Sequence, residues 1–341
     1  MAAGASGTVG TVKLAFVGTG GIAQTHAGAL KALGDRARVV AAADTQADAL
    51  GRFAEGEDLA RFDNATALMD AIAAGSVDVD GVVVCTPPNV RTQVVEGALN
   101  AGVGVLIEKP LASTGPEARS LAQSAANHPD VVAAVGYCHR FTPAVIAMKK
   151  LVEEGRIGQL ARFENVFAFH HPPMSERWFS DPAVSGGGSF IDTGCHSLDL
   201  FQFLVGTPRV AGGVFHNPWQ GRGDASASII VRAEAGTHQG VAGVILSGWL
   251  EPARFWVRLV GTDGALFYDY EKPTEIFHTA PDGNVNLLEV ETHDVRFERQ
   301  LAAFVDAVAE GKTAAEVGLA TLEHGARVAE AVDEAHNSCS L

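Results

Sequence analysis

Cysteine is scarce in this sequence of 341 residues, which contains only four. They are widely separated along the chain and form no CxxC pair: Cys85, Cys138, Cys195 and Cys339. This spacing argues against a disulfide framework and against a zinc site built from thiolates. We therefore expect reduced thiols and a cytoplasmic protein.

Basic charge is also in short supply, with 25 Lys and Arg against 40 Asp and Glu and a net charge of −15. Such a surface repels phosphate backbones and anionic lipids, so we expect no nucleic-acid partner and no membrane. The chain also lacks an apolar run as long as a membrane span. The first ten residues lack the basic start and apolar core of an export signal, and we interpret them as a flexible leader.

A glycine-rich turn between a strand and a helix is the first motif present. The apolar segment 12–17 leads into a GxGxxA sequence, after which the helical pattern 22–33 begins. Glycines permit a tight turn and the close approach of a pyrophosphate, and a small last residue lets the helix pack on the strand. The motif predicts these dinucleotide contacts: Gly18, Gly20, Gly21, Ile22 and Ala23. The alternative is a turn of the same shape with no ligand.

The next predicted strand, 38–43, ends in Asp44, 21 residues after Ala23. A carboxylate at this place accepts hydrogen bonds from the adenosine ribose. No arginine follows it closely, so a 2′-phosphate would meet a bare carboxylate. We therefore expect NAD as the cofactor, with NADP less favoured. Asp44 could also cap the predicted helix 47–53.

Strands and helices continue to alternate through 81–85, 92–101, 105–107, 115–126 and 131–135, which predicts about six parallel strands. A turn after segment 81–85 falls at the carboxyl edge of this sheet, so we expect Thr86, Pro87 and Asn89 to contact the cofactor. The pattern predicts a Rossmann domain over residues 11–136.

The segment 105–111, VLIEKPL, places charged groups at another strand end, because Pro110 cannot continue a sheet ladder. Glu108 and Lys109 should therefore lie at the ligand crevice, where we expect both to contact the cofactor. A lysine held there can lose hydration and have its pKa lowered, which suits proton exchange near neutrality. The alternative is a solvated lysine on a turn.

From Tyr137 onward the alternation gives way to long strands, predicted at 159–170, 210–216, 225–234, 241–250, 254–259 and 265–270. This pattern predicts an α+β domain over residues 137–341, with helices 296–310 and 314–335 packing at its end. Segment 241–250 is more apolar than a half-solvated strand requires. A sheet face covered by a second subunit would explain it, so we expect a homodimer or homotetramer.

A glycine turn at 186–188 precedes a predicted helix in which Asp192, His196 and Asp199 share one face. A carboxylate and an imidazole presented together suit reaction with a hydroxyl. The alternatives are a solvated Asp/His pair and a metal site; we expect no metal, because hydride transfer needs only a base and the cofactor. Before this helix, His170, His171 and Trp178 could bind a sugar ring or merely pack in their loop.

Several segments together are specific: GTGGIA at 18–23, TPP at 86–88, EKPLA at 108–112, GYCHRFTPAVIAMKKLVEEGRIGQL at 136–160 and SGGGSFIDTGCHSLDL at 185–200. The sequence resembles the Gfo/Idh/MocA family of NAD(P)-dependent sugar and polyol oxidoreductases over nearly its whole length. The resemblance implies a Rossmann domain, then a domain whose large, mostly antiparallel sheet packs between subunits. It also implies that Lys109, Asp192 and His196 surround the substrate carbinol. Arg91 departs from the pattern, since the family often has histidine there.

We thus predict an NAD-dependent dehydrogenase acting on a secondary alcohol of a sugar, polyol or sugar derivative, or the reverse reductase. His196 would take the hydroxyl proton with a pKa within about a unit of 6.5, Lys109 would polarise the oxygen, and Asp192 would fix the substrate. Tyr137 should line the cleft between the domains. Two alternatives are a glycosidase with tightly bound NAD, acting by transient oxidation and elimination, and a non-catalytic dinucleotide-sensing regulator.

Overall fold

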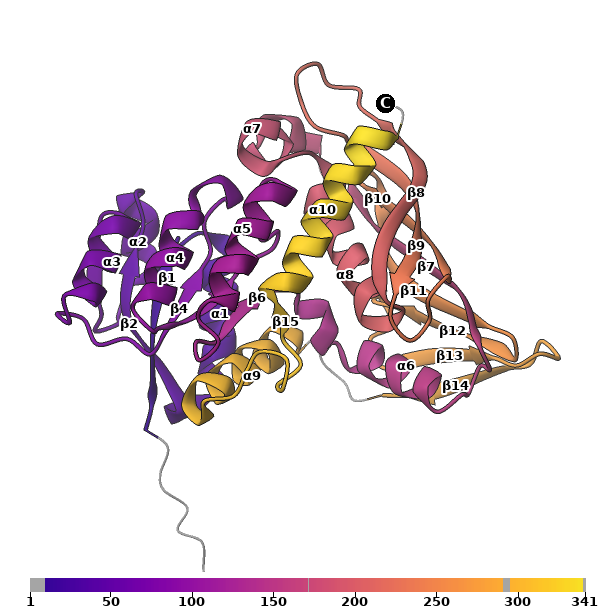
Figure 1. Ribbon diagram of the computed structural model, residues 1–341, viewed down its shortest axis with the longest axis horizontal. Helices are drawn as coiled ribbons and strands as arrows, with labels where there is room; N and C mark the ends of the chain where they lie inside the picture. The colour runs from indigo at the N-terminus through magenta and orange to yellow at the C-terminus, as the bar shows by residue number, and fades with distance from the viewer. Residues whose placement is uncertain (1–9, 171, 291–294, 340–341) are drawn as a thin grey trace, which may run out of the picture.

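The computed structural model describes residues 10–170, 172–290 and 295–339, so the predicted leader, save its last residue, and His171 lie outside the described residues. Two sheets dominate the architecture and lie at opposite ends of the molecule (Figure 1). The long C-terminal helix α10 (Leu322–Ser338) crosses between them and contacts both α5 and β8.

The first sheet has seven strands in the order β15-β6-β5-β4-β1-β2-β3, and its first six strands in sequence are parallel. Their bounds are β1 Val12–Val17, β2 Ala37–Ala43, β3 Ala60–Phe62, β4 Gly81–Val84, β5 Gly104–Ile107 and β6 Ala133–Val135. The reversal of strand order beside β1 creates the crevice in which dinucleotides bind in such sheets. The predicted Rossmann fold is confirmed.

Helices cover both faces of this sheet (Figure 1). They are α1 Gly21–Lys31, α2 Ala47–Phe53, α3 Ala65–Ala73, α4 Thr92–Asn100 and α5 Gly115–Ala126. Because both faces are covered, strands such as β4 and β5 are buried at every residue, which explains their continuous apolar sequences.

The second sheet has eight strands in the order β14-β13-β12-β11-β7-β10-β9-β8, and all neighbours are antiparallel except β7 and β10. The bounds are β7 Leu160–His170, β8 Thr207–His216, β9 Ser226–Ala235, β10 Ala242–Gly248, β11 Leu250–Gly261, β12 Gly264–Asp269, β13 Glu275–Thr279 and β14 Val285–Glu289. This confirms the predicted large, mostly antiparallel sheet.

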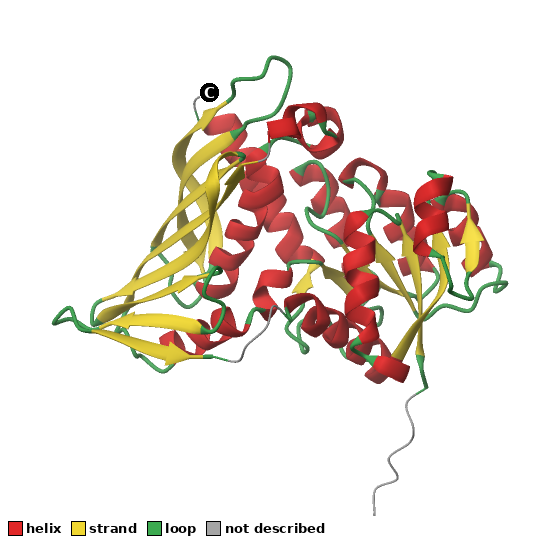
Figure 2. Cartoon of the chain, turned by 180° about the vertical axis from the view of Figure 1, so that it is seen from behind, coloured by secondary structure: helices red, strands yellow, loops and turns green. Residues whose placement is uncertain are grey.

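Helices pack on one face of the second sheet only (Figure 2). Among them, α6 (Pro143–Glu153) contacts β12 and β13, while α8 (Cys195–Leu204) contacts β7, β8 and β10. We call this the inner face and the opposite one the outer face. Strand β7 places Phe163, Asn165 and Phe167 on the inner face, where all three are buried.

The chain returns to the first sheet after the second is complete. Helix α9 (Arg296–Glu310) packs against α1 and β1, and the short strand β15 (Ala320–Thr321) pairs antiparallel with β6. The ring of Phe304 fills the space above Gly81 and Gly104, where an added Cβ would lie 3.0 and 3.5 Å from it. The division at residues 136 and 137 stays a prediction, but α9 and β15 pack with the first sheet.

No helix in the described ranges combines the length and the apolar character needed to cross a membrane. The four cysteines are all free thiols within the part of the chain that the structure covers. The cytoplasmic location stays a prediction.

Candidate active site

The end of β5 meets the segment before α8 at a buried ion pair. Lys109 Nζ donates hydrogen bonds to the Asp192 carbonyl oxygen and to Asp192 Oδ1, both at 2.9 Å. The two side chains are only 18% and 12% exposed. The structure therefore brings together two of the three residues predicted to act on the substrate.

The ion pair determines the protonation state of Lys109. Burial by itself lowers the pKa of the ammonium, as we expected, but the charge of Asp192 and its hydrogen bond outweigh burial and raise the pKa above its ordinary value. The prediction of a lowered pKa was therefore wrong. Lys109 stays a cation at neutral pH, which suits it to stabilise negative charge and not to accept a proton.

The second oxygen of Asp192 is held by a tryptophan that sequence reasoning missed. Trp249 Nε1 donates to Asp192 Oδ2 at 3.2 Å, and the Trp249 side chain is fully buried. Trp219 stacks on its indole at 6.2 Å between ring centroids. Trp249 follows β10, 57 residues after Asp192, so only the assembled sheet brings the two together.

His196 lies in the first turn of α8, beside the ion pair. The ring of His139 meets it edge-on at 4.6 Å, and the ring of Tyr137 does so at 6.1 Å. Its Nδ1 is buried and has no hydrogen-bond partner among the described residues. Among the residues that the structure describes, no carboxylate bonds to this imidazole, and the two oxygens of Asp192 bond to Lys109 and Trp249.

Burial lowers the pKa of His196 well below its ordinary value, and the positive charge of Lys109 adds to the effect. Our expectation of a pKa near 6.5 was wrong because it counted on Asp192 to offset Lys109. In the folded protein the Asp192 carboxylate pairs with Lys109 and Trp249 instead. His196 is thus a neutral imidazole, free to accept a proton.

Asp199, which we predicted to share one helical face with Asp192 and His196, lines neither of the two cavities of the site. Residues Phe190–Gly194 form a π-helical turn, which changes the helical period between Asp192 and His196. Asp199 instead accepts two-point hydrogen bonds from the buried guanidinium of Arg140, at 2.6 to 3.1 Å. This pair anchors α8 to the segment that follows β6.

The glycine turn forms the cofactor side of the site. Gly18 has φ +84°, and an added Cβ would lie 2.8 Å from the Cys85 carbonyl carbon, so only glycine fits. A Cβ atom added at Gly20 or Gly21 would meet nothing within 4 Å. In the described chain no side chain caps the start of α1. The amide groups of this helix terminus therefore suit an anion such as a pyrophosphate.

Asp44 lies at the end of β2 beside this turn. Its Oδ2 accepts hydrogen bonds from the Thr19 amide at 2.7 Å and the Thr19 hydroxyl at 2.9 Å, and its Oδ1 accepts from the Gln46 amide at 2.8 Å. The carboxylate therefore braces the glycine turn as well as standing where a ribose would bind. It does not cap α2, whose N-cap residue is Gln46.

Arg91, the departure from the family pattern, is buried and bonds to backbone carbonyls. It donates to the carbonyl oxygens of Thr86, at 2.9 Å from Nε, and of Glu108 and Pro110. Burial lowers its pKa to about 10. Arg91 thus ties the turn after β4 to the turn after β5, next to Lys109.

Glu108 is buried against α1 and not solvated. Its Oε1 lies 2.7 Å from Nε2 of the fully buried His26, and its Oε2 accepts from the Lys109 amide at 3.1 Å. Burial raises the pKa of Glu108, but the hydrogen bond from His26 and the nearby cations outweigh it, and the net shift is downward. The pair of Glu108 and His26 therefore links α1 to the end of β5, next to Lys109.

Two cavities meet at Lys109 and Asp192. One, of about 210 Å³, lies on the glycine-turn side and is lined by Ile22, Cys85, Thr86, Pro88, Arg91, Glu108, Lys109, Pro110, Trp178, Phe179, Ser185, Ile191 and Asp192. The other, of about 410 Å³, lies against the second sheet and is lined by Lys109, His139, Thr142, Phe167, Phe169, Asp192, Thr193, His196, Phe255, Tyr268, Tyr270, Pro273 and Arg296. We call them the cofactor cavity and the substrate cavity.

The aromatic and polar residues predicted to bind substrate are not all brought to the substrate cavity. Trp178 lines the cofactor cavity and stacks on Phe179 at 3.9 Å. Tyr137 packs behind His196, while His170 is exposed at the end of β7 and lines neither cavity. Asn89 is exposed on its turn, whereas Thr86 lines the cofactor cavity.

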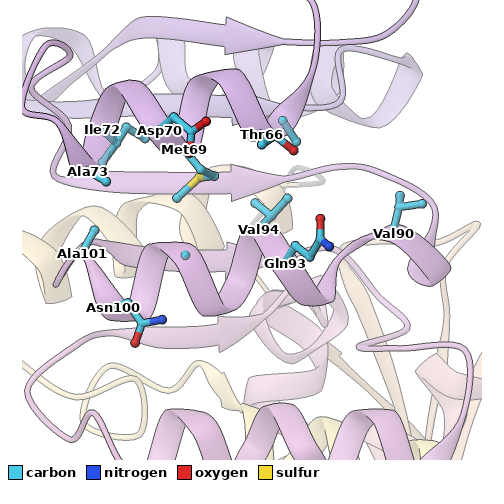
Figure 3. Close-up of a pocket in the computed structure, with 12 residues that line it drawn as sticks. Thr66, Met69, Asp70, Ile72, Ala73, Val90, Gln93, Val94, Asn100 and Ala101 are labelled. Atoms are coloured by element: carbon cyan, nitrogen blue, oxygen red, sulfur yellow. The ribbon is translucent and has the colours of Figure 1, made fainter.

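A third hollow lies outside this region, between α3 and α4 (Figure 3). Met69 and Ile72 project from α3, and Val94 from α4, into a groove whose only titratable side chain is Asp70. Nothing in this lining offers a base beside a nucleophile, so we assign the chemistry to the two cavities around Lys109.

Comparison with protein families places both parts of the chain. Residues 12–137 match the oxidoreductase family with an NAD-binding Rossmann fold, and residues 145–267 match the C-terminal domain of the Gfo/Idh/MocA proteins. Together the two matches span most of the chain.

Curated relatives include inositol 2-dehydrogenase of Rhizobium meliloti, which is 26% identical over 94% of this chain and 91% of its own. Levoglucosan dehydrogenase of Pseudarthrobacter phenanthrenivorans is 31% identical, but this match covers only 42% of the chain and 37% of that relative. Rhizopine catabolism protein MocA of Rhizobium meliloti is 28% identical over 88% of the chain and 87% of its own.

Solved structures share the fold over nearly the whole chain. A levoglucosan dehydrogenase in complex with NADH superposes with a TM-score of 0.83 at 20% identity, covering 96% of this chain and 97% of that one. A 3-ketoreductase from Actinomadura kijaniata, in complex with TDP-benzene and NADP, gives 0.80 at 22% identity and covers 97% and 98%. At these identities the likeness establishes the fold alone.

Proposed function

The chain belongs to the Gfo/Idh/MocA oxidoreductase family, and from this premise we propose that it is an NAD-dependent dehydrogenase that oxidises a secondary alcohol of a sugar, polyol or sugar derivative, or catalyses the reverse reduction. One observation carries the proposal. Lys109, Asp192 and His196 gather where the cofactor cavity meets the substrate cavity, so a carbinol bound there faces both a base and a cation.

His196 takes the hydroxyl proton in the proposed reaction. Its lowered pKa keeps it neutral near pH 7, and the imidazole lines the substrate cavity while its Nδ1 is buried. Its other nitrogen, Nε2, is therefore the atom that accepts the proton from the substrate.

Lys109 holds the substrate oxygen as negative charge develops on it. An ammonium has three donor hydrogens, and two of them bond to Asp192. The third is left for the substrate oxygen, and the positive charge favours the alkoxide over the alcohol. Asp192, held by Trp249, fixes the direction in which the ammonium points. Lys109 therefore presents a positive charge to the substrate oxygen and keeps its own proton.

NAD, and not NADP, is the proposed cofactor; bound in the cofactor cavity, it supplies the hydride acceptor. The support comes from Asp44, whose carboxylate stands beside the glycine turn and would repel a 2′-phosphate. Relatives with this fold carry NADH in one structure and NADP in another, so the comparison of kcat/KM for the two cofactors is the direct test. A tenfold preference for NADP would overturn this part of the proposal.

The activity itself is tested by incubating the protein with NAD and a panel of polyols, free sugars, anhydrosugars and glycosides. A dehydrogenase accumulates NADH over many turnovers. A glycosidase that keeps NAD bound would instead release an aglycone without net NADH, and a non-catalytic regulator would bind NAD and produce neither. Either of these two results would overturn the proposed function.

We also propose that the outer face of the second sheet binds a second copy of the chain. The strand registers place five exposed aliphatic side chains on this face, at 36% to 59% exposure: Val214, Ile230, Val244, Val285 and Leu287. Phe267 and Phe277 lie between them on β12 and β13. No helix of the described chain covers the face (Figure 2), and so much exposed apolar surface is typical of an interface.

Sedimentation at micromolar concentration tests this assembly, and we expect a dimer or tetramer. Replacing Ile230 and Val244 by Asp should dissociate it, because two unpaired carboxylates would replace exposed aliphatic side chains that the second copy covers. A wild-type protein that sediments as a monomer would contradict the proposal.

A further inference from the structure

The glycine turn at 186–188 lies between two other backbone segments and touches both. A Cβ added at Gly186 would lie 1.9 Å from the Ser113 carbonyl oxygen, in the segment between β5 and α5. A Cβ added at Gly188 would lie 2.0 Å from the Asp224 carbonyl oxygen, in the loop between β8 and β9. Only glycine permits both approaches, so the turn fixes the helix start that follows it.

Asp224 supplies the hydrogen-bond acceptors for this helix start. Its Oδ2 accepts from the Ser189 hydroxyl at 2.7 Å and from the Phe190 amide at 2.9 Å, and its carbonyl oxygen accepts from the Ser189 amide at 2.7 Å. The first amides of a helix have no partner within the helix, and an anion is favoured beside them. Because Asp224 is only 4% exposed, water cannot easily take its place.

The other oxygen of Asp224 bonds to the C-terminal helix. His336 Nε2, near the end of α10, lies 3.1 Å from Asp224 Oδ1. The His336 ring also packs on Phe215 of β8, at 4.7 Å between ring centroids, where α10 runs beside that strand (Figure 1). These contacts fix the orientation of the carboxylate, so that Oδ2 faces the helix start.

The same loop also fixes Trp249. The carbonyl oxygen of Ala225, the residue after Asp224, accepts a hydrogen bond from the Trp249 amide at 2.9 Å. Asp192 lies one turn into the helix, where its amide donates to the Gly188 carbonyl oxygen at 3.1 Å. The segment 224–225 therefore positions both partners of the bond between Asp192 and the Trp249 indole.

From these contacts, and resting on the proposed function, we propose that Asp224 is a positioning residue for the reaction. It lines neither cavity, but it determines where Asp192 meets Lys109 and so where the ammonium points. Removing its side chain leaves the buried Ser189 hydroxyl and Phe190 amide without their acceptor, and the helix start must shift to find another. A misplacement of about 1 Å can cost about 10²-fold in rate.

Kinetics of two substitutions at this position test the proposal. In Asp224→Ala, kcat should fall at least about tenfold, while the Kd for NADH stays within about twofold of wild type. Asp224→Asn keeps an oxygen that can accept from the helix start, so its kcat should recover to within about threefold of wild type. An Asp224→Ala enzyme with wild-type kcat would overturn the proposal.

Asp333→Ala is the matched control. Asp333 also caps a distant helix, because its Oδ2 accepts from the Gly115 amide at 2.7 Å at the start of α5. No residue of α5 lines either cavity. The control should therefore lose stability and keep the wild-type kcat. An equal loss of kcat in Asp333→Ala and Asp224→Ala would reduce the role of Asp224 to general stability and overturn the proposal.

A spectroscopic signature reports the position of Asp192 without any turnover. The chain has four tryptophans, so ¹⁵N labelling gives four indole signals. Trp249→Phe identifies the signal of Trp249, and Asp192→Ala shows where this signal lies once the bond is lost. In Asp224→Ala the signal should move toward the Asp192→Ala position, and the indole hydrogen should exchange with solvent at least about tenfold faster. In Asp224→Asn and Asp333→Ala it should stay near its wild-type position.

This signal separates the inference from the proposed function. If no sugar or polyol yields NADH, the proposed dehydrogenase activity fails, and the Trp249 indole signal still decides whether Asp224 positions Asp192. If the enzyme is active but the signal of Asp224→Ala stays at its wild-type position, the inference fails while the dehydrogenase stands.

Thermal melting identifies a variant that fails to fold. If Asp224→Ala does not fold, Ser189→Ala takes its place, because it removes only one of the three hydrogen bonds that Asp224 accepts at the helix start. We then expect a shifted Trp249 signal and a kcat about threefold lower. A Ser189→Ala protein with the wild-type signal and kcat would overturn the inference.

Discussion

The cofactor side and the substrate side of the site are built in opposite ways. On the cofactor side, the backbone amides of a glycine turn lie within about a dozen consecutive residues of β1 and α1, next to a cavity that Ile22, the turns after β4 and β5, and side chains between residues 178 and 192 line. The substrate cavity consists of side chains from β7, β11 and β12 and from the segments that follow β6 and precede α8. Backbone groups recognise what all dinucleotides share, whereas side chains gathered from distant strands can differ between relatives.

This comparison predicts that changes on the substrate side lower kcat and leave cofactor binding intact. Changes on the cofactor side should weaken cofactor binding and leave kcat nearly unchanged. The four predictions that follow are ordered from the largest expected effect to the smallest.

Lys109→Met should lower kcat on the order of 10³-fold, because it removes the cation that stabilises the developing alkoxide. Steady-state kinetics and titration with NADH measure the two sides separately, and the Kd for NADH should change little. Lys149→Met, which removes an exposed lysine paired with Glu153 on α6, is the matched control. If the Lys109→Met enzyme kept its activity, the substrate oxygen would have to bind away from Lys109.

His196→Ala should lower kcat about 10²-fold or more, since it removes the proposed base. The wild-type oxidation rate should hold as the pH falls from 8 to 6.5, because the lowered pKa of His196 keeps the imidazole unprotonated there, and should fall only at more acidic pH. The variant should lack this acidic limb. His170→Ala, an exposed histidine outside both cavities, should keep the wild-type rate and profile.

Asp44→Asn should raise KM for NAD about tenfold, because a neutral amide holds the Thr19 amide and hydroxyl less strongly than a carboxylate does. The value of kcat should stay within about twofold of wild type if the two cavities act separately. The control is Asp48→Asn, in the first turn of α2. A large loss of kcat in Asp44→Asn would show that the cofactor side and the substrate side do not act separately.

Trp249→Phe should lower kcat about fivefold, the smallest effect, because it removes a single hydrogen bond to Asp192 and keeps the ring packing. A KM for NAD equal to that of wild type would show that the bond acts on the substrate side. Trp256→Phe, on the outer face of β11, is the matched control. If both variants behave alike, Trp249 does not position Asp192.

The first sheet and the glycine turn could be predicted from sequence because their signals are local. Strand β1, its turn and helix α1 follow one another, and helices α2, α5 and α9 begin and end at the predicted residues. The strands β3 (ARF), β13 (EIFHT) and β14 (VNLLE) were not predicted. They lack the continuous apolar sequence by which the equally short strands β4 and β5 could be predicted.

Only those site residues that lie within distinctive sequence motifs could be predicted. Lys109, Asp192 and His196 lie in distinctive segments and do come together. Trp249, His139 and Tyr270 have no local signal, since they acquire their contacts from tertiary packing of β10, β12 and the turn after β6. Both pKa predictions failed for the same reason. They required knowing which partner the Asp192 carboxylate contacts, and spacing along a helix does not reveal that.

The return of α9 to the first sheet has a consequence for how the protein forms during synthesis. The ring of Phe304 fills the space over Gly81 and Gly104, two residues with no side chain of their own to fill it. A ribosome must therefore translate the whole second sheet before the core of the first can close. Until then β4 and β5 have an uncovered apolar face, and such a face is prone to nonspecific association while translation continues.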